Sequence, residues 1–177
     1  LLCRAAPFEI DTMDDFWVFV NSVNSAQTKY QQDVNLNTDL DFSTKPLETP
    51  IGYNGEVPKA WSGTFEGNGH VVKNLVQQND EKSGACGLFS MITEATIKNL
   101  VIDETCNMVG NNSAAVALSA LDFVLENIVN HGKISGSSCS GGLVCDAVNG
   151  KFVSCENDGQ VFSAANAGGL AGLATSV

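Results

Sequence analysis

A repeat that begins after Trp61 constrains this chain more than any other feature. Four segments share a pattern in which apolar residues flank an Asn, or a Ser in the last segment. These segments are residues 71–76, 96–101, 124–129 and, more loosely, 151–155. The Asn residues of the first three segments are 25 and 28 positions apart. Spacing of this order is typical of proteins built from stacked structural units.

A second motif, a small residue followed by Leu, comes after each of these segments. Its leucines are 30, 25 and 27 positions apart. A third correspondence links the last two units, because residues 130–134 match residues 157–161 at an offset of 27. The copies of the second motif are Gly87-Leu88, Ala117-Leu118, Gly142-Leu143 and Gly169-Leu170.

Each unit contains about three short strand-like runs and no helical period. Such a unit cannot bury its apolar face alone, but it can do so as one turn of a coil stacked on the next. Leucine-rich repeats share the period, yet they need several leucines per unit, whereas most units here have one or two. We therefore expect an all-β fold, a parallel β-helix of about four coils. Stacking predicts two interior ladders, one of Leu88, Leu118, Leu143 and Leu170 and one of Asn74, Asn99 and Asn127.

The N-terminal part of the chain predicts a single amphipathic helix. Thr12 and Asp15 have the spacing of a capping box, with Asp in place of the usual Glu or Gln. An apolar stripe at helical spacing follows and ends before Asn24. One helix cannot form a bundle, so we expect it to cap the coil. The predicted organisation is an N-terminal segment with the capping helix over 1–32 and one β-helix domain over 33–177. The stripe consists of Phe16, Phe19, Val20 and Val23.

Several motifs resemble those of the GLUG-repeat parallel β-helix domains of bacterial and protist surface proteins. The likeness covers roughly residues 9–177 and is carried by residues 61–70, by Lys73-Asn74-Leu75 and by the Gly-Leu motifs. The Gly-Leu-hydrophobic-Gly signature is intact at 169–172, degraded at 87–90 and 142–145, and nearly lost at 117–120. Such domains also occur in the N-terminal region of streptococcal IgA-cleaving metallopeptidases. The resemblance implies the fold and a surface location, because the motif is architectural rather than catalytic.

Six cysteines and one sequon point to an oxidising compartment. No Cys-x-x-Cys pair accompanies the two histidines, which argues against a structural zinc site. Six cysteines allow 15 pairings, among which we favour Cys145–Cys155 and then Cys86–Cys106. The sequon predicts N-glycosylation of Asn111 in an exposed turn. The chain also opens without Met, as a processed secreted protein or a fragment would.

Few residues suggest a catalytic or metal-binding site. Asn37-Thr38-Asp39 is also found in polygalacturonases, but the paired Asp and the Gly-His-Gly that accompany it there have no counterpart here. Asp39, Asp41 and Glu48 could approach Ca²⁺, although calcium needs six to eight oxygen ligands. The two histidines lie in turns, His70 after Gly-Asn-Gly and His131 in a position taken by Asp in the next unit. We therefore predict no catalytic residue, no cofactor and no metal.

The charge and the hydropathy of the chain limit the kinds of partner that it can bind. Twenty acidic against nine basic residues leave a formal net charge of -11, which argues against nucleic acid. No apolar run is long enough to insert into a membrane. We expect a non-catalytic, extracellular structural module of a cell-surface protein or self-assembling fibre. It would stack head to tail through open β-helix ends, with copies of itself or with neighbouring domains. The alternatives are a glycan-binding adhesin module and an enzyme that degrades polysaccharide.

Overall fold

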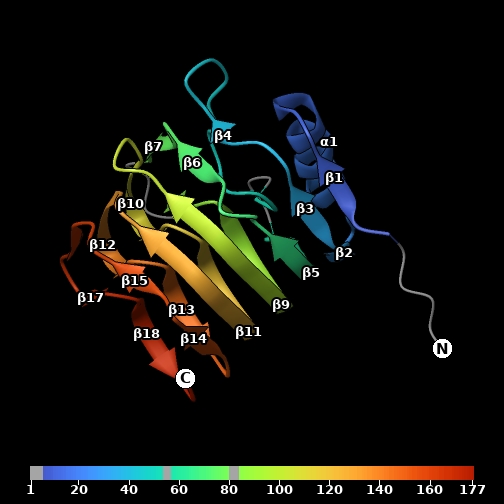
Figure 1. The fold of residues 1–177 in the computed structure, drawn as a ribbon. Helices are drawn as coiled ribbons and strands as arrows, with labels where there is room; N and C mark the ends of the chain where they lie inside the picture. The colour runs from blue at the N-terminus through green and yellow to red at the C-terminus, as the bar shows by residue number, and fades with distance from the viewer. Residues whose placement is uncertain (1–5, 54–56, 80–83) are drawn as a thin grey trace.

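All strand pairings in the described residues, 6–53, 57–79 and 84–177, are parallel. The computed structural model is a β-solenoid of about six turns, 56% strand and 7% helix (Figure 1). The expected parallel β-helix is confirmed, but the count of about four coils is too low. The sequence repeat begins after Trp61, whereas strands before it already stack in register.

The part of the chain that the structure describes has one helix, which follows the first strand, and otherwise consists of strands of 2 to 14 residues. The sequence of elements is β1 (Phe8–Ile10), α1 (Met13–Asn24), β2 (Lys29–Gln31), β3 (Val34–Leu36), β4 (Leu40–Asp41), β5 (Ala60–Glu66), β6 (Val71–Lys73), β7 (Val76–Gln78), β8 (Ala85–Cys86), β9 (Phe89–Ile102), β10 (Asn107–Ala114), β11 (Ala117–Asn130), β12 (Lys133–Gly141), β13 (Val144–Val148), β14 (Lys151–Val153), β15 (Glu156–Asn157), β16 (Val161–Ser163), β17 (Asn166–Gly168) and β18 (Ala171–Thr175).

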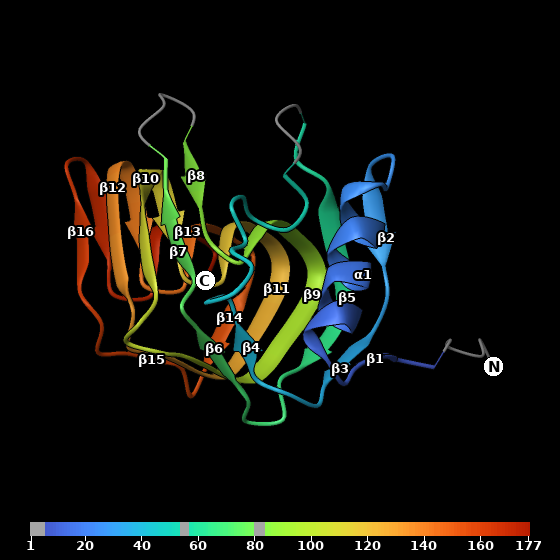
Figure 2. The same cartoon turned by 90° about the horizontal axis from the view of Figure 1, so that it is seen from above.

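Two sheets form the walls of the solenoid. The larger sheet has the order β1-β3-β5-β9-β11-β13-β18, and the smaller one has the order β16-β12-β10-β7, with the shorter strands attached beside these paths. Strands that are far apart in the sequence therefore lie side by side. Figure 2 shows the coils following one another from α1 at one end to β16 at the other. Within the described residues, no helix has the length and hydrophobicity of a membrane span.

One interior ladder runs through six coils of the larger sheet. Phe65 aligns with Val34 on one side and with Ile97 on the other, and all three side chains are buried. The neighbouring positions alternate outward, as the period of two in a strand requires. Burial of this continuous apolar row is what stabilises each short strand. The complete ladder is Phe8, Val34, Phe65, Ile97, Leu125 and Phe152.

The expected leucine ladder is wrong at one position. Ala117 pairs with Phe89 and Val144, so the residue that aligns with Leu88 and Leu143 is Val116. Leu118 instead lies half-buried in a separate small cluster. Ala115-Val116 and Ala117-Leu118 both consist of a small residue followed by an apolar one, so the sequence pattern did not distinguish the two alignments. The ladder at this corner is Leu88, Val116, Leu143 and Leu170.

The expected asparagine ladder is also only partly present. Asn127 Nδ2 donates to Asn99 Oδ1 at 2.8 Å, and Asn99 Nδ2 donates to Glu66 Oε1 at 2.8 Å. Asn74 lies at another corner, where its Nδ2 donates to Asp41 Oδ1 at 2.8 Å. Asn74, Asn99 and Asn127 share a left-handed backbone, with φ of 56°, 56° and 53°. The shared Asn therefore reflects a common turn conformation, which Asn tolerates, and not one common ladder.

The helix α1 forms as the sequence predicts. Thr12 and Asp15 make the reciprocal capping box, and the helix ends at Asn24. The whole expected stripe is buried. Figure 2 shows α1 lying across the N-terminal end of the solenoid. Strands β1 and β2 precede residue 33 and pair within the larger sheet, so the expected boundary at 32/33 does not separate the helix from the coils.

Phe19 joins the helix to the first coils. Its side chain is 1% exposed, and its ring lies 6.3 Å from the rings of both Trp61 and Phe65. Its centroid is also 6.4 Å from that of Phe89. Edge and tilted contacts of this kind add to the free energy gained by burying the rings. The cap is therefore part of the core.

We expect Phe19→Ala to lower the free energy of unfolding by about 3–5 kcal/mol, because it leaves a cavity between the helix and three aromatic rings. Val18→Ala is the matched control on the same helix, since Val18 is exposed and should change stability by no more than about 0.5 kcal/mol. Urea denaturation of both variants measures the two values. Equal losses would contradict the capping role of Phe19.

Candidate functional site

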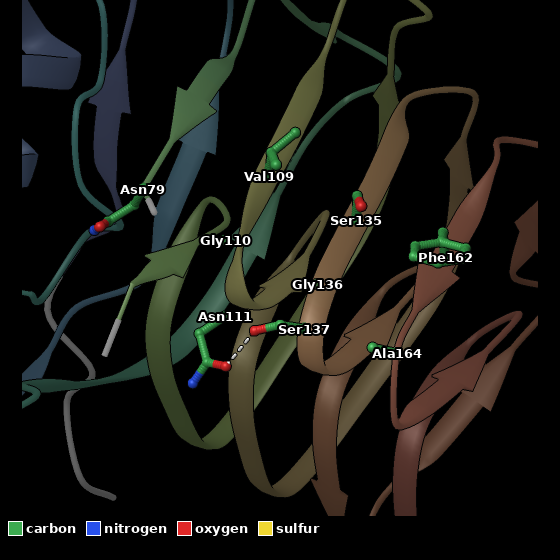
Figure 3. Close-up of a pocket in the computed structure, with 9 residues that line it drawn as sticks. All are labelled: Asn79, Val109, Gly110, Asn111, Ser135, Gly136, Ser137, Phe162 and Ala164. Atoms are coloured by element: carbon green, nitrogen blue, oxygen red, sulfur yellow. Dashed lines mark hydrogen bonds between the residues drawn. The ribbon is translucent and has the colours of Figure 1, made fainter. Parts of the chain in front are cut away.

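A groove on the smaller sheet is one of several hollows on the surface of the solenoid. It lies where strands β10 and β12 bend, and the pairing of these strands shifts register between Gly110 and Asn112. Its cavity volume is about 330 Å³. Figure 3 shows its lining drawn from successive coils. The lining residues are Asn79, Val109, Gly110, Asn111, Ser135, Gly136, Ser137, Phe162 and Ala164.

Two glycines make the bend possible. A Cβ on Gly136 would lie 2.6 Å from Ser140 Oγ and 2.8 Å from the Cys139 carbonyl oxygen. A Cβ on Gly110 would lie 2.9 Å from Cys86 Sγ. Because backbone and side chains approach so closely here, only glycine fits without a shift of its neighbours. The sequence places a glycine at the aligned position of both strands, and the groove follows from it.

The lining is polar but uncharged. Ser137 Oγ donates to Asn111 Oδ1 at 2.6 Å across the groove (Figure 3). Phe162 aligns with Ser135, which aligns with Val109, so the three side chains form one outward row. Phe162 is 66% exposed. The groove thus combines hydroxyl and amide groups with an exposed aromatic ring.

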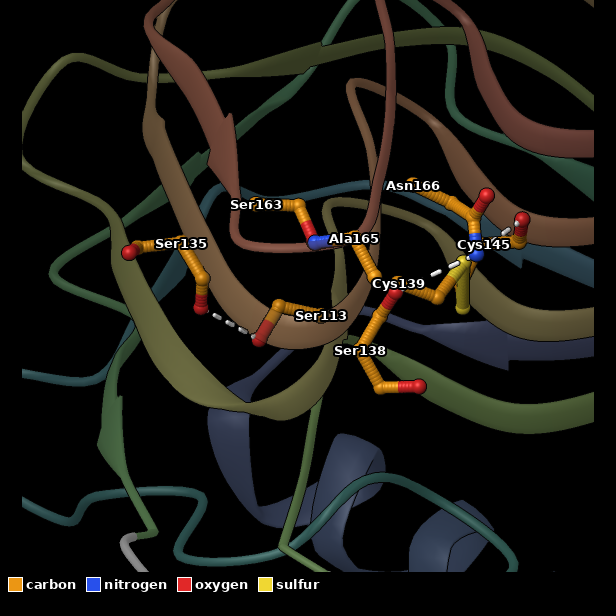
Figure 4. Close-up of a disulfide and its surroundings, with 8 residues drawn as sticks. All are labelled: Ser113, Ser135, Ser138, Cys139, Cys145, Ser163, Ala165 and Asn166. Atoms are coloured by element: carbon orange, nitrogen blue, oxygen red, sulfur yellow. Dashed lines mark hydrogen bonds between the residues drawn. A yellow bond between two sulfur atoms is a disulfide. The ribbon is translucent and has the colours of Figure 1, made fainter.

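The sequon lies in this region, but not in the expected exposed turn. Asn111 belongs to strand β10, and Ser113 is fully buried. Ser113 Oγ donates to the Ser135 carbonyl oxygen at 2.9 Å (Figure 4). The polar composition of this segment comes from a bent strand, which sequence patterns do not separate from a turn. N-glycosylation of Asn111 stays a prediction.

The disulfide pairing differs from the expected one. Cys139 is bonded to Cys145, with Cα atoms 5.7 Å apart (Figure 4). This bond excludes Cys145–Cys155, and Cys106 is a free, buried thiol, so Cys86–Cys106 is wrong as well. The sequence favoured bridges across a turn or a coil, whereas the corner between β12 and β13 brings together two cysteines only six positions apart. Cys3 lies outside the described residues.

The thiols of Cys106 and Cys155 donate hydrogen bonds to the backbone of the preceding coil. Cys106 Sγ donates to the Val72 carbonyl oxygen at 3.3 Å, and Cys155 Sγ donates to the Leu125 carbonyl oxygen at 3.3 Å. Burial raises the pKa of Cys106 to about 11. A thiol held in the neutral form is a poor nucleophile, so the position of Cys106 suits packing rather than chemistry.

Two of the three acidic residues expected near calcium, Asp39 and Asp41, hold coils together. Asp39 accepts hydrogen bonds from Lys73 Nζ at 2.7 Å and from the Val71 backbone N–H at 3.0 Å. Asp41 accepts from Asn74 and from the Ser43 backbone N–H at 2.9 Å. Among the described residues, no three His, Cys, Asp or Glu side chains are grouped to hold a metal.

The two histidines form similar links between coils. His70 Nδ1 lies 3.1 Å from Asp39 Oδ1, and His131 Nδ1 lies 2.5 Å from Asp158 Oδ1. The Asp residue that aligns with His131 in the next coil is therefore its partner. Comparing the repeat units showed that His131 and Asp158 occupy equivalent positions. The stacking of the coils brings their side chains into contact.

Peptide mapping of the oxidised protein should find the bridge Cys139–Cys145. When the protein is unfolded with iodoacetamide and without reductant, Cys106 and Cys155 should be alkylated. We expect Cys145→Ser to lower the free energy of unfolding by about 2 kcal/mol, because the open loop regains entropy in the unfolded chain. Cys155→Ser, measured by the same denaturation, is the control that leaves the bridge intact. A linked peptide containing Cys145 and Cys155 would contradict this pairing.

Stability should fall between about pH 4 and pH 2, because the hydrogen bond from Lys73 lowers the pKa of Asp39 from 3.8 to about 2. Above its unfolded pKa the charged carboxylate contributes fully, and protonation through the folded pKa removes that contribution. The side chain is 38% exposed, so solvent screening limits the effect to below about 1 kcal/mol. Asp39→Asn and Lys73→Gln should both flatten this part of the curve of unfolding free energy against pH. An unchanged slope in both variants would contradict the assignment.

Comparisons with known proteins give one similar sequence and one similar structure. No family model matches the chain. The chain is 28% identical over 148 residues to Halomucin of Haloquadratum walsbyi, an alignment that covers 78% of this chain and 2% of Halomucin. The crystal structure described as "a putative immunoglobulin A1 protease from Bacteroides ovatus" aligns with a TM-score of 0.63 at 14% identity. That alignment covers 96% of this chain and 62% of the other. At this identity the structural likeness shows a common solenoid fold.

Proposed function

We propose that this chain is a non-catalytic structural module of an extracellular surface protein. The observation that carries the proposal is the use of its outward charged groups as ties between coils. Asp39 binds Lys73 one coil away, and Glu66 binds Lys98 at 3.0 Å in the next. His131 binds Asp158 in the same manner. Residue types that carry catalysis elsewhere serve here to hold one coil to another.

Three further findings support a surface location. The disulfide Cys139–Cys145 suits an oxidising compartment. The formal net charge of -11 favours solubility of a repetitive protein. The relative with similar sequence is named Halomucin, which favours a surface protein. Membership of the GLUG-repeat family is part of the proposal, supported by Gly142 and Gly169 at one corner, where a Cβ on Gly142 would lie 1.9 Å from the Gly169 carbonyl oxygen.

We further propose that the coil at β18 stacks on another coil, in a second copy or a neighbouring repeat. Ala174 aligns with the buried Ala147 and so faces the core side, yet it is exposed. Leu170, at the corner ladder, is likewise only partly buried. An added coil in the same register would cover both residues. The opposite end of the core is closed by α1, so β18 offers the freer surface for stacking.

Concentrated protein should self-associate through this end. Light scattering across a concentration series should show a rising mass, and negative-stain micrographs should show rows of stacked solenoids. Ala174→Lys should abolish the association, because it places a charge where the next coil would bury it. Leu173→Lys is the matched control, since Leu173 is the neighbouring residue on the outward face of the same strand.

Two results would count against stacking. A constant monomer mass at every concentration would remove self-association. Equal effects of Ala174→Lys and Leu173→Lys would show that added charge acts generally rather than through the core-facing position.

A further inference from the structure

We propose that the groove on the smaller sheet, lined as described above from Asn79 to Ala164, binds a neutral polysaccharide. This role goes beyond the structural function and uses a different surface. The groove lies on the side of the solenoid, across strands β10, β12 and β16 with Asn79 just after β7, whereas stacking uses the end at β18. The two roles can therefore be tested separately.

The charge of the lining selects the class of ligand. The chain has 29 charged residues, nine basic and twenty acidic, and none of the nine lining residues is among them. An anionic polysaccharide would need basic side chains to offset a net charge of -11. A cationic ligand would be expected to meet carboxylates, which the lining does not supply. A neutral ligand with many hydroxyl groups fits this surface.

The polar groups of the groove match such a ligand. The Ser135 hydroxyl can donate and accept hydrogen bonds, as sugar hydroxyls do, and Ser137 Oγ, whose proton is directed to Asn111, can accept one. The hydrogen bond between Ser137 and Asn111 fixes the orientation of one pair before a ligand arrives. Ligand sites commonly combine a few oriented polar groups with apolar surface in a concave place.

Phe162 supplies the apolar surface. Its ring is 66% exposed and lies in the outward row with Ser135 and Val109. A further coil at this end of the solenoid would pair with the backbone edge of β16. The Phe162 ring points outward from the sheet, so it would stay exposed on the side of the solenoid. An exposed ring of this size is available to stack on the C–H face of a sugar. Figure 3 shows it at one end of the lining.

The direction of the groove favours a polymer over a single sugar. Its lining comes from successive coils, at a strand spacing of about 4.8 Å. Val109, Ser135 and Phe162 come from three successive strands, and Ala164 directly follows the last of these strands. A polymer lying along the solenoid axis would contact side chains of several coils at once, so weak contacts add. Trp, Tyr and Arg, which dominate protein interfaces, do not line this groove, and this disfavours a protein partner.

The test is affinity electrophoresis of the full chain in native gels that contain one polysaccharide each. The protein is produced in bacteria, so that Asn111 carries no glycan in the groove. The neutral probes are galactomannan, xyloglucan, laminarin and soluble starch, and the anionic probes are alginate and polygalacturonate. We expect slower migration with at least one neutral probe and with neither anionic probe.

Variants connect the binding to the groove. Phe162→Ala should weaken binding of the retarding probe about tenfold, whereas Phe162→Tyr should keep it, because the ring remains. Val153→Ala is the control, since Val153 is exposed on β14, away from the groove lining. Phe162 is exposed, so Phe162→Ala should leave the unfolding curve unchanged, and a loss of binding will not be a loss of folding.

Three outcomes would overturn the proposal. They are no retardation by any neutral probe, retardation by the anionic probes alone, and neutral binding that Phe162→Ala leaves unchanged. Ala174→Lys separates this proposal from stacking, because it should remove self-association and keep the retardation. If stacking fails and the retardation depends on Phe162, the groove proposal stands by itself.

Discussion

The parallel backbone hydrogen bonds between successive coils are the interaction on which everything else in this chain depends. They set the register that places Ile97 between Phe65 and Leu125, so that one apolar side chain covers the next. A single coil could not bury its core face without a neighbouring coil. The same register brings opposite charges together on the outside, as in Glu66 and Lys98. Core and surface are thus organised by one repeated contact.

The register also makes buried polar groups tolerable. Asn130 is fully buried, and its Oδ1 accepts from the Gly132 backbone N–H at 3.0 Å. Its Nδ2 donates to Asn157 Oδ1 in the next coil at 2.7 Å. An unpaired amide at this depth would cost about 1–3 kcal/mol, so the stacked partner is essential. Asn130 and Asn157 are the first residues of the two matching segments, 130–134 and 157–161, that lie 27 positions apart in the sequence.

Much of the architecture could be predicted because it depends on local patterns and on the repeat. The capping box of Thr12 and the solenoid itself are of this kind. What could not be predicted depends on register and bends. The corner ladder contains Val116, two residues before the expected Leu118. Cys139 is bonded to Cys145 across a corner, and the composition of the chain does not determine the geometry of that corner. The groove was missed for the same reason, although the aligned glycines of β10 and β12 were its one visible signal.

The helix α1 gives the solenoid a direction. Because it fills one end of the core with Phe19 and its neighbours, coils can be gained or lost at the other end without disturbing the aromatic cluster. Length could then vary between related proteins in steps of one coil, while the capped end stays constant. In such an arrangement the first coil is aligned by its contacts with the cap, and each later coil is aligned by its hydrogen bonds with the coil before it.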